Sequence, residues 1–280
     1  EYTNAITTVD QSKINKVPIE INAPYLSEMV RQEMFNRYGE NAYIDGYSVY
    51  TTIKSSLQKS ATNSLKNGIE NYDKRHGYRR PTVKMDIGEF LNTNFVFDLD
   101  KAKNSAIIFM KKYFTINDHV PAVILQVNKR SVVVVNKNEE LFELDLSSLF
   151  TSREYIDENK KKKIRNFQDI FSLGDLIRVK KFKNNTWKIT QLPVVSGAIV
   201  SIDANSGALI AISGGYSFNI SKFNRATQAK RQPGSSFKPF IYYSAFEKGF
   251  TPASIVNDSP KIFKDKDISE FWRPQNFGGK

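Results

Sequence analysis

The sequence predicts an α+β fold in which a small β-barrel of five strands interrupts a larger mixed domain. The first observation behind this prediction is a series of five short runs of strand-forming residues between positions 120 and 192. The second is the pattern on either side of these runs: a strand and an amphipathic helix before them, a hairpin and an apolar helix after them. The flanking parts are expected to share one sheet, so the ends of the inserted segment must lie close together.

Residues 1–45 are expected to form a linker that contains one helix. Proline is favoured in the first turn of a helix because the N–H that it lacks would have no partner there, and Pro24 fits that position. The apolar stripe of this predicted helix consists of Tyr25, Met29, Val30 and Met34.

Residues 46–117 are expected to begin the larger domain. Residues 47–53 are rich in aromatic and β-branched side chains and predict a strand. Ser56 and Lys59, in the helix predicted next, form a Ser-x-x-Lys pair, but Lys59 lies opposite Leu57, so we interpret the pair as exposed surface. The apolar stripe of that helix consists of Ile53, Leu57, Ala61, Leu65, Ile69 and Tyr72.

Residues 118–192 are expected to form the insert. A single helical pattern, residues 164–172, lies between the third and fourth predicted strands, and this order is typical of an OB-like barrel. The four lysines of residues 160–163 predict a solvated loop, because like charges repel one another. The five strands are predicted at residues 120–127, 131–136, 140–146, 175–182 and 187–192.

Composition excludes several classes of function. The net charge of +12 raises nucleic acid as a partner, but the aromatic residues of the insert are few and do not alternate with its lysines, so base stacking on its strands is not expected. There are no cysteines, and the two histidines are His76 and His119, so we expect neither a metal site nor a cofactor. No apolar run approaches the roughly 18 residues that span a bilayer.

Residues 193–280 are expected to complete the larger domain. Residues 197–202 and 208–212 predict a hairpin whose loop contains glycine. Gly214 and Gly215 are expected to open a flexible link toward the apolar helix.

The start of that helix places a hydroxyl and an amine three residues apart. Pro233 and Gly234 break the preceding structure, and Ser235 and Lys238 then share one helical face. The apolar spacing that follows predicts a largely buried helix, in which burial and the unpaired amides of the first turn would favour an uncharged amine. An uncharged lysine can take the proton of a serine hydroxyl, so the pattern predicts a nucleophile. The alternative from local sequence is a serine N-cap with an exposed lysine.

The residues before this pair favour the nucleophile. Residues 223–239, from Phe-Asn-Arg-Ala-Thr-Gln to Ser-Ser-Phe-Lys-Pro, closely resemble the start of the transpeptidase domain of class A (bifunctional) penicillin-binding proteins, which has a serine β-lactamase-like fold. By this resemblance Ser235 is the acylated nucleophile and Lys238 activates it. The resemblance implies a D,D-transpeptidase or carboxypeptidase. Its serine attacks the D-Ala-D-Ala amide of a peptidoglycan stem peptide, releases D-Ala and passes the acyl group to a neighbouring strand, and β-lactams acylate the same serine.

The family pattern is incomplete in this sequence. The Ser-x-Asn and Lys-Thr-Gly elements do not appear after Lys238, and residues 271–277 resemble a Trp-x-Pro-x-Asn segment that lies between the first two motifs. Trp272 and Asn276 are therefore possible neighbours of the substrate cleft. We expect a fragment that is inactive by itself, with the family's glycosyltransferase domain and membrane anchor outside it.

The resemblance also implies a location and partners. Family members face the periplasm from the inner membrane, and some carry an OB-like insert that contacts outer-membrane lipoprotein regulators. The alternative interpretation of the chain is a non-catalytic OB-type module that binds protein or glycan strands.

Overall fold

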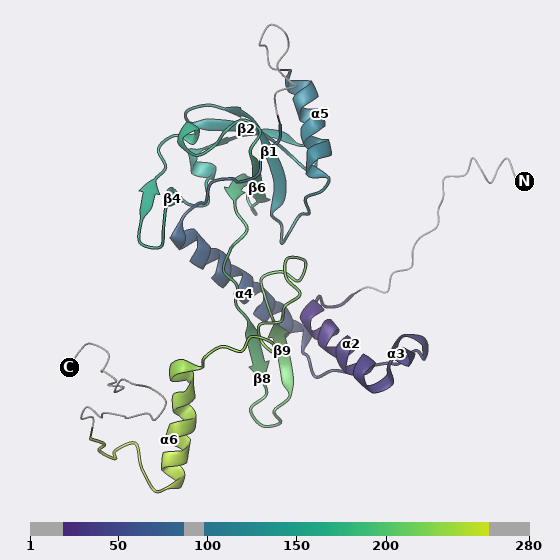
Figure 1. Cartoon of the computed structure of the whole chain (residues 1–280), viewed down its shortest axis with the longest axis vertical. Coiled ribbons are helices and arrows are strands. Elements are labelled where there is room, and N and C mark those ends of the chain that lie inside the picture. The colour runs from purple at the N-terminus through teal and green to yellow at the C-terminus, as the bar shows by residue number, and fades with distance from the viewer. Residues whose placement is uncertain (1–18, 87–97, 258–280) are drawn as a thin grey trace, which may run out of the picture. The chain divides into compact units, whose positions relative to one another are not determined.

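A computed structural model of the chain describes residues 19–86 and 98–257 (Figure 1). The chain forms two compact units, residues 1–229 and residues 230–280. The helices of the first unit are α2 (Pro24–Tyr38), α3 (Asn41–Ile44), α4 (Ser55–His76) and α5 (Leu99–Met110). Its strands are β1 (Val120–Val127), β2 (Ser131–Asn136), β3 (Leu141–Asp145), β4 (Arg153–Tyr155), β5 (Lys161–Lys163), β6 (Leu176–Lys181), β7 (Trp187–Thr190), β8 (Ile199–Ile202) and β9 (Leu209–Ser213), with 3₁₀ turns η2 (Leu146–Ser148) and η3 (Phe167–Asp169). The second unit holds η4 (Gly234–Phe237) and α6 (Lys238–Glu247).

Helix α2 begins at Pro24, as the sequence predicts, and ends before Gly39. Its one buried side chain, Tyr25, anchors the helix to the segment after β9. The Tyr25 hydroxyl donates to the Ser221 carbonyl at 2.9 Å, and its ring packs edge-on against Phe218 at 5.1 Å between centroids.

The strand predicted at residues 47–53 is wrong, because this segment has no regular structure. It runs beside β9 but makes only isolated contacts: the Thr52 hydroxyl donates to the Leu209 carbonyl at 2.6 Å, and the Lys54 N–H donates to the Ile210 carbonyl at 3.0 Å. Strand propensity reflects side chains that fit a half-buried surface, whereas Tyr50 is 94% exposed.

Helix α4 confirms the predicted helix, but its buried face is rotated from the predicted stripe. Ala61, Leu65 and Ile69 are buried as expected, whereas Leu57 and Tyr72 are exposed. Gln58 and Asp73 are buried in their place because each finds polar partners, which are described below. Ser56 and Lys59 are exposed, which confirms that this second Ser-x-x-Lys pair is surface.

Five antiparallel strands form the sheet of the inserted domain in the order β3-β2-β1-β6-β7. All five coincide with predicted strands to within two residues at each end. Strand β1 is buried on both faces: Ala122 and Ile124 face the main core, and Val123 and Leu125 face α5. The edge strands approach each other, since the rings of Phe142 and Trp187 stack at 5.2 Å. The arrangement is compatible with an OB-like barrel.

Two predictions inside the insert are wrong. The helix expected at residues 164–172 is only the 3₁₀ turn η3, although its buried residues have helical spacing. The Ile164 N–H donates to the Ser152 carbonyl and the Ser172 N–H donates to the Asp175 carboxylate, so the hydrogen bonds at both ends of the segment are made outside a helix. The lysines of residues 160–163 are exposed as expected, but Lys161–Lys163 form strand β5, which pairs with β4 rather than remaining a loop.

Helix α5 lies against this sheet (Figure 1). Asp98 caps its start by accepting from the Lys101 N–H at 3.0 Å. Its small buried residues, Ala102 and Ala106, let the helix lie close to the sheet, and Met110 fills the end of the contact. The insert therefore packs as a unit that includes α5.

Strands β8 and β9 form the predicted hairpin, with residues 203–208 as the loop. The flexible link expected after it is wrong. Gly214, Gly215 and Tyr216 are buried, and a side chain at Gly214 would collide with the backbone of Asn224. Glycine is needed here because the returning chain packs directly on the end of β9.

In the second unit, α6 begins one residue after the 3₁₀ turn that holds Ser235. The burial predicted for this helix is not found, since none of its residues is buried. Apolar side chains surround α6 on every face, a pattern typical of a helix in a protein interior, but the described residues of its own unit do not cover it. Its exposed apolar residues are Phe240, Ile241, Tyr242, Tyr243 and Phe246.

Candidate active site

Ser235 lies in a tight turn that the sequence builds from Pro233 and Gly234. Gly234 has φ +54°, in the left-handed region that glycine adopts without strain, so the chain can reverse immediately before the serine. The Ser236 N–H donates to the Pro233 carbonyl at 3.1 Å, which closes the first part of the turn. The predicted break before Ser235 is therefore confirmed.

Lys238 follows Ser235 by one 3₁₀ turn. The Lys238 backbone N–H donates to the Ser235 carbonyl, so the two residues are bound through the main chain. Both side chains are exposed, and no hydrogen bond joins them within the described part of the chain. The backbone thus holds the hydroxyl and the amine one turn apart, whereas the enclosing surface expected for an activated lysine is not formed by the described residues.

The segment that leads to this turn is fixed by Asn224, whose role the sequence did not reveal. The Asn224 Oδ1 accepts from the Ala226 N–H at 3.1 Å, and the Asn224 N–H donates to Gln228 Oε1 at 2.6 Å. The Arg225 N–H donates to the Gly214 carbonyl at 3.0 Å and ties the segment to the end of β9. No local pattern in the sequence marks this asparagine, because the backbone that its segment contacts lies at the end of β9.

A groove of about 630 Å³ lies in the first unit between α2, α4 and the segment after β9. Its lining is mixed and includes Ser56, Lys59 and Asn63 from α4 and Ser217 and Asn219 from the segment after β9. It belongs to a different unit from Ser235, so we assign it no part in the candidate active site.

The described residues offer no cluster of three histidine, aspartate or glutamate side chains that could bind a metal ion. Within residues 19–86 and 98–257, no helix has the length and apolar character needed to cross a membrane. Trp272 and Asn276, the possible cleft neighbours, lie outside the described residues.

Two family models match the chain in succession. Residues 95–195 match the penicillin-binding protein OB-like domain, and residues 197–279 match the penicillin-binding protein transpeptidase domain. The second match contains Ser235, Lys238 and the turn between them. The chain therefore belongs to the penicillin-binding proteins and has their α+β fold with an OB-like domain.

Particular relatives narrow this assignment. The chain is 38% identical over 258 residues to penicillin-binding protein 1A of Pseudomonas aeruginosa and 39% identical over 260 residues to that of Escherichia coli K12, in each case over 92% of the chain. The crystal structure of penicillin-binding protein 1A from Haemophilus influenzae superposes on the whole chain with a TM-score of 0.77 and 32% identity, and the chain covers 38% of that structure. The chain spans 30% and 29% of the length of the two sequence relatives.

Proposed function

We propose that the protein that contains this chain cross-links peptidoglycan by serine acyl transfer. In this reaction the Lys238 amine takes the Ser235 proton while the serine oxygen attacks the D-Ala-D-Ala carbonyl of a stem peptide. The peptide C–N bond then breaks, and D-Ala leaves with the proton as its amine. An amine of a neighbouring strand attacks the resulting ester, and the serine recovers its proton when the new amide forms.

The observation that carries this proposal is the turn from Gly234 to Lys238, which lies inside the transpeptidase match and holds a serine and a lysine one turn apart. The same serine would be acylated by a β-lactam, whose ring opens and leaves the acyl group on Ser235. Water in place of the acceptor amine would give D,D-carboxypeptidase activity.

The exposed apolar faces of α6 indicate that a further surface would be needed to complete such a site. A helix with Phe240, Ile241 and Tyr243 exposed gains stability when another surface covers it, at roughly 25 cal/mol for each Å² of apolar area removed from water. We propose that the sequence beyond Lys280 supplies this cover and the missing Ser-x-Asn and Lys-Thr-Gly elements. The chain alone is then expected to be inactive.

Location and partners follow from the same proposal. Stem peptides and β-lactams are the substrate classes, and the protein would face the periplasm from the inner membrane, tethered by a segment before Glu1. We further propose four parts: a linker at residues 1–45, a first transpeptidase part at 46–117, the insert at 118–192 and a second transpeptidase part at 193–280. The packing of α5 on β1 and β2 favours including α5 in the insert.

The OB-like domain supports a second candidate function, a binding surface for outer-membrane lipoprotein regulators. This candidate rests on a well-packed domain of its own, with a core that includes Val132, Val134 and Phe167. Deleting residues 118–192 should abolish regulator binding. Unchanged binding after the deletion would reject this role.

A fluorescent penicillin tests the acyl-transfer proposal. We expect covalent labelling of a protein that continues past Lys280, loss of labelling in Ser235→Ala, and normal labelling in the neighbouring control Ser236→Ala. Labelling that survives Ser235→Ala would place the nucleophile elsewhere. The chain of 280 residues should show weak labelling or none.

A further inference from the structure

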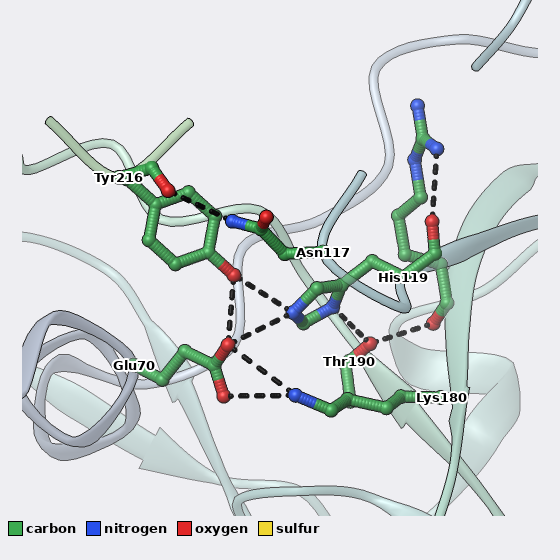
Figure 2. A network of polar contacts seen from close by, with 7 residues as sticks. Glu70, Asn117, His119, Lys180, Thr190 and Tyr216 are labelled. Atoms are coloured by element: carbon green, nitrogen blue, oxygen red, sulfur yellow. Dashed lines mark hydrogen bonds and ion pairs between the residues drawn. The ribbon is translucent and has the colours of Figure 1, made fainter. Parts of the chain in front are cut away.

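A carboxylate on α4 is shared by three segments that are far apart in the sequence. Figure 2 shows Glu70 reaching from α4 toward His119, Lys180 and Tyr216. The Tyr216 hydroxyl donates to Glu70 Oε1 at 2.8 Å, and Lys180 Nζ lies 3.3 Å from Glu70 Oε2. His119 Nε2 is 3.2 Å from Glu70 Oε1. The inserted domain and the segment after β9 therefore bind the same carboxylate.

His119 completes the link because its ring contacts both sides. Its Nε2 lies 2.9 Å from the Tyr216 hydroxyl, and its Nδ1 lies 2.8 Å from the Thr190 hydroxyl on β7. Since Tyr216 gives its single proton to Glu70, its oxygen must accept from His119, which assigns a proton to Nε2. Nδ1 can then accept the single proton of the Thr190 hydroxyl at 2.8 Å, which is shorter than the 3.4 Å contact of that hydroxyl with the Arg178 carbonyl, and both ring nitrogens have partners.

Burial makes this arrangement sensitive to the loss of one member. His119 is 2% exposed, Thr190 5% and Tyr216 5%. Burial alone would raise the pKa of Glu70, but hydrogen bonds from His119 and Tyr216 and the charge of Lys180 outweigh it and lower the pKa to about 2. Burial and the nearby Glu70 raise the pKa of the Tyr216 hydroxyl. The carboxylate is thus held charged and the phenol neutral, which keeps the donors and acceptors in fixed roles.

A second contact connects the same two parts of the protein. The Asn117 side-chain amide donates to the Tyr216 carbonyl at 2.8 Å. Asn117 lies three residues before β1, so the chain that enters the sheet and the segment after β9 are bound by contacts at both the carbonyl and the hydroxyl of Tyr216.

We propose that Glu70, His119, Lys180 and Tyr216 form a coupling junction, through which displacement of the inserted domain changes the stability of the segment after β9. Lys180 is the informative member because it contacts Glu70 but nothing in that segment. A partner that engages β6 and draws Lys180 away from Glu70 would weaken the hold on Tyr216. By thermodynamic linkage, a change in the stability of this segment would change the stability of the inserted domain by the same coupling free energy. The proposal does not depend on the acyl-transfer function.

Hydrogen exchange of the 280-residue chain tests the junction. The reporters are the Ile220 and Ser221 amides, which both donate to the Ser217 carbonyl. Lys180→Met should speed their exchange about tenfold, the scale of a lost hydrogen bond to a charged group. The matched control is Lys183→Met, in the same β6–β7 hairpin but without an ion pair among the described residues, and it should leave both amides unchanged.

Two outcomes would overturn the proposal. Unchanged exchange at Ile220 and Ser221 in Lys180→Met would show that the inserted domain and the segment are independent. An equal rise in the exchange rate of the Val133 amide would show general loosening of the sheet rather than coupling, because Val133 lies in the β2–β3 pair and takes no part in the junction. The variants are expected to fold, because Arg79, which pairs with Asp73 on α4, also donates to the Leu192 carbonyl at the end of the insert.

The reciprocal experiment uses Tyr216→Phe, which removes only the hydroxyl between Glu70 and His119. It should speed exchange of the His119 amide, which donates to the Ile116 carbonyl at 2.9 Å. Tyr72→Phe on the exposed face of α4 is the control and should have no effect there. Faster exchange at His119 in Tyr216→Phe alone supports coupling in both directions, whereas equal exchange in the two variants would overturn it.

Discussion

The side chain of Gln58 on α4 bonds both main-chain groups of Ile212 on β9. Gln58 Nε2 donates to the Ile212 carbonyl at 2.7 Å, and Gln58 Oε1 accepts from the Ile212 N–H at 2.8 Å. Among the described residues, β9 pairs with a strand along one edge only, that of β8, so this side chain satisfies part of the other edge. Gln58 is 1% exposed, and the helix is therefore docked on the hairpin by a buried amide as well as by Leu65 and Ile69.

Gln58→Ala should destabilise the first unit by about 3 kcal/mol. The substitution leaves a buried N–H and a buried carbonyl of Ile212 without partners, and each costs about 1–3 kcal/mol. Urea unfolding measures the loss, and exchange of the Ile212 amide locates it. Gln32→Ala, on the exposed surface of α2, should change the free energy of unfolding by less than about 0.5 kcal/mol. Equal effects of the two substitutions would contradict the docking role.

Asp73 near the end of α4 gives a second prediction. Arg79 donates to both Asp73 oxygens at 2.8 and 3.0 Å, and Gln191 Nε2 donates to one of them at 2.6 Å. Asp73 is 2% exposed, so Arg79→Met would leave a buried carboxylate without its charge partner. We expect a loss of about 3 kcal/mol in the free energy of unfolding, measured in urea.

The control for Arg79→Met is Arg37→Met. Arg37 pairs with Glu33 on α2 at 2.6 Å, but both side chains are more than half exposed, and an exposed pair of this kind contributes at most about 0.5 kcal/mol. A small effect at both positions would show that Asp73 is adequately satisfied by Gln191 alone.

These two polar contacts explain where the sequence was informative and where it was not. Short runs of strand-forming residues placed all five strands of the insert, since these runs supply the side chains that pack in the core or against α5. Apolar spacing also found α4, but it could not reveal that Gln58 and Asp73 are buried in place of Leu57 and Tyr72. Their burial depends on partners more than 100 residues away, Ile212 and Gln191.

In the candidate active site too, the features that depend on local sequence were predicted and those that depend on tertiary packing were not. Pro233, Gly234 and the Ser-x-x-Lys spacing predicted a turn with a serine and a lysine, because these signals are local. The predicted burial of α6 is a tertiary property and was not found. His119 is a single histidine with no motif around it, so the junction with Glu70 and Tyr216 left no signal in the sequence.

The lowered pKa of Glu70 predicts how its contribution to stability depends on pH. The folded-state pKa of about 2 lies below the ordinary value of 4.5, so the charged form is favoured in the folded protein. The contribution of Glu70 is therefore fully present above pH 4.5 and is lost as the pH falls toward about 2. The difference in free energy of unfolding between the wild type and Glu70→Gln should be constant from pH 7 to about 5 and should shrink below that. Urea unfolding at a series of pH values measures it, and a difference that stays constant down to pH 3 would contradict the prediction.

Lys238→Ala tests the role proposed for the amine beside Ser235. In a protein that continues past Lys280, loss of a group that accepts the serine proton should slow acylation by a fluorescent penicillin about 100-fold or more. Lys248→Ala, at the other end of α6 and also exposed, controls for the loss of a positive charge near the helix and should leave the rate unchanged. The rate should also be followed against pH, because removing the proton acceptor should flatten the rise of the acylation rate with pH, whereas a purely structural effect would lower the rate equally at every pH. Near-normal acylation in Lys238→Ala would remove the proposed role and require another group to accept the proton of Ser235.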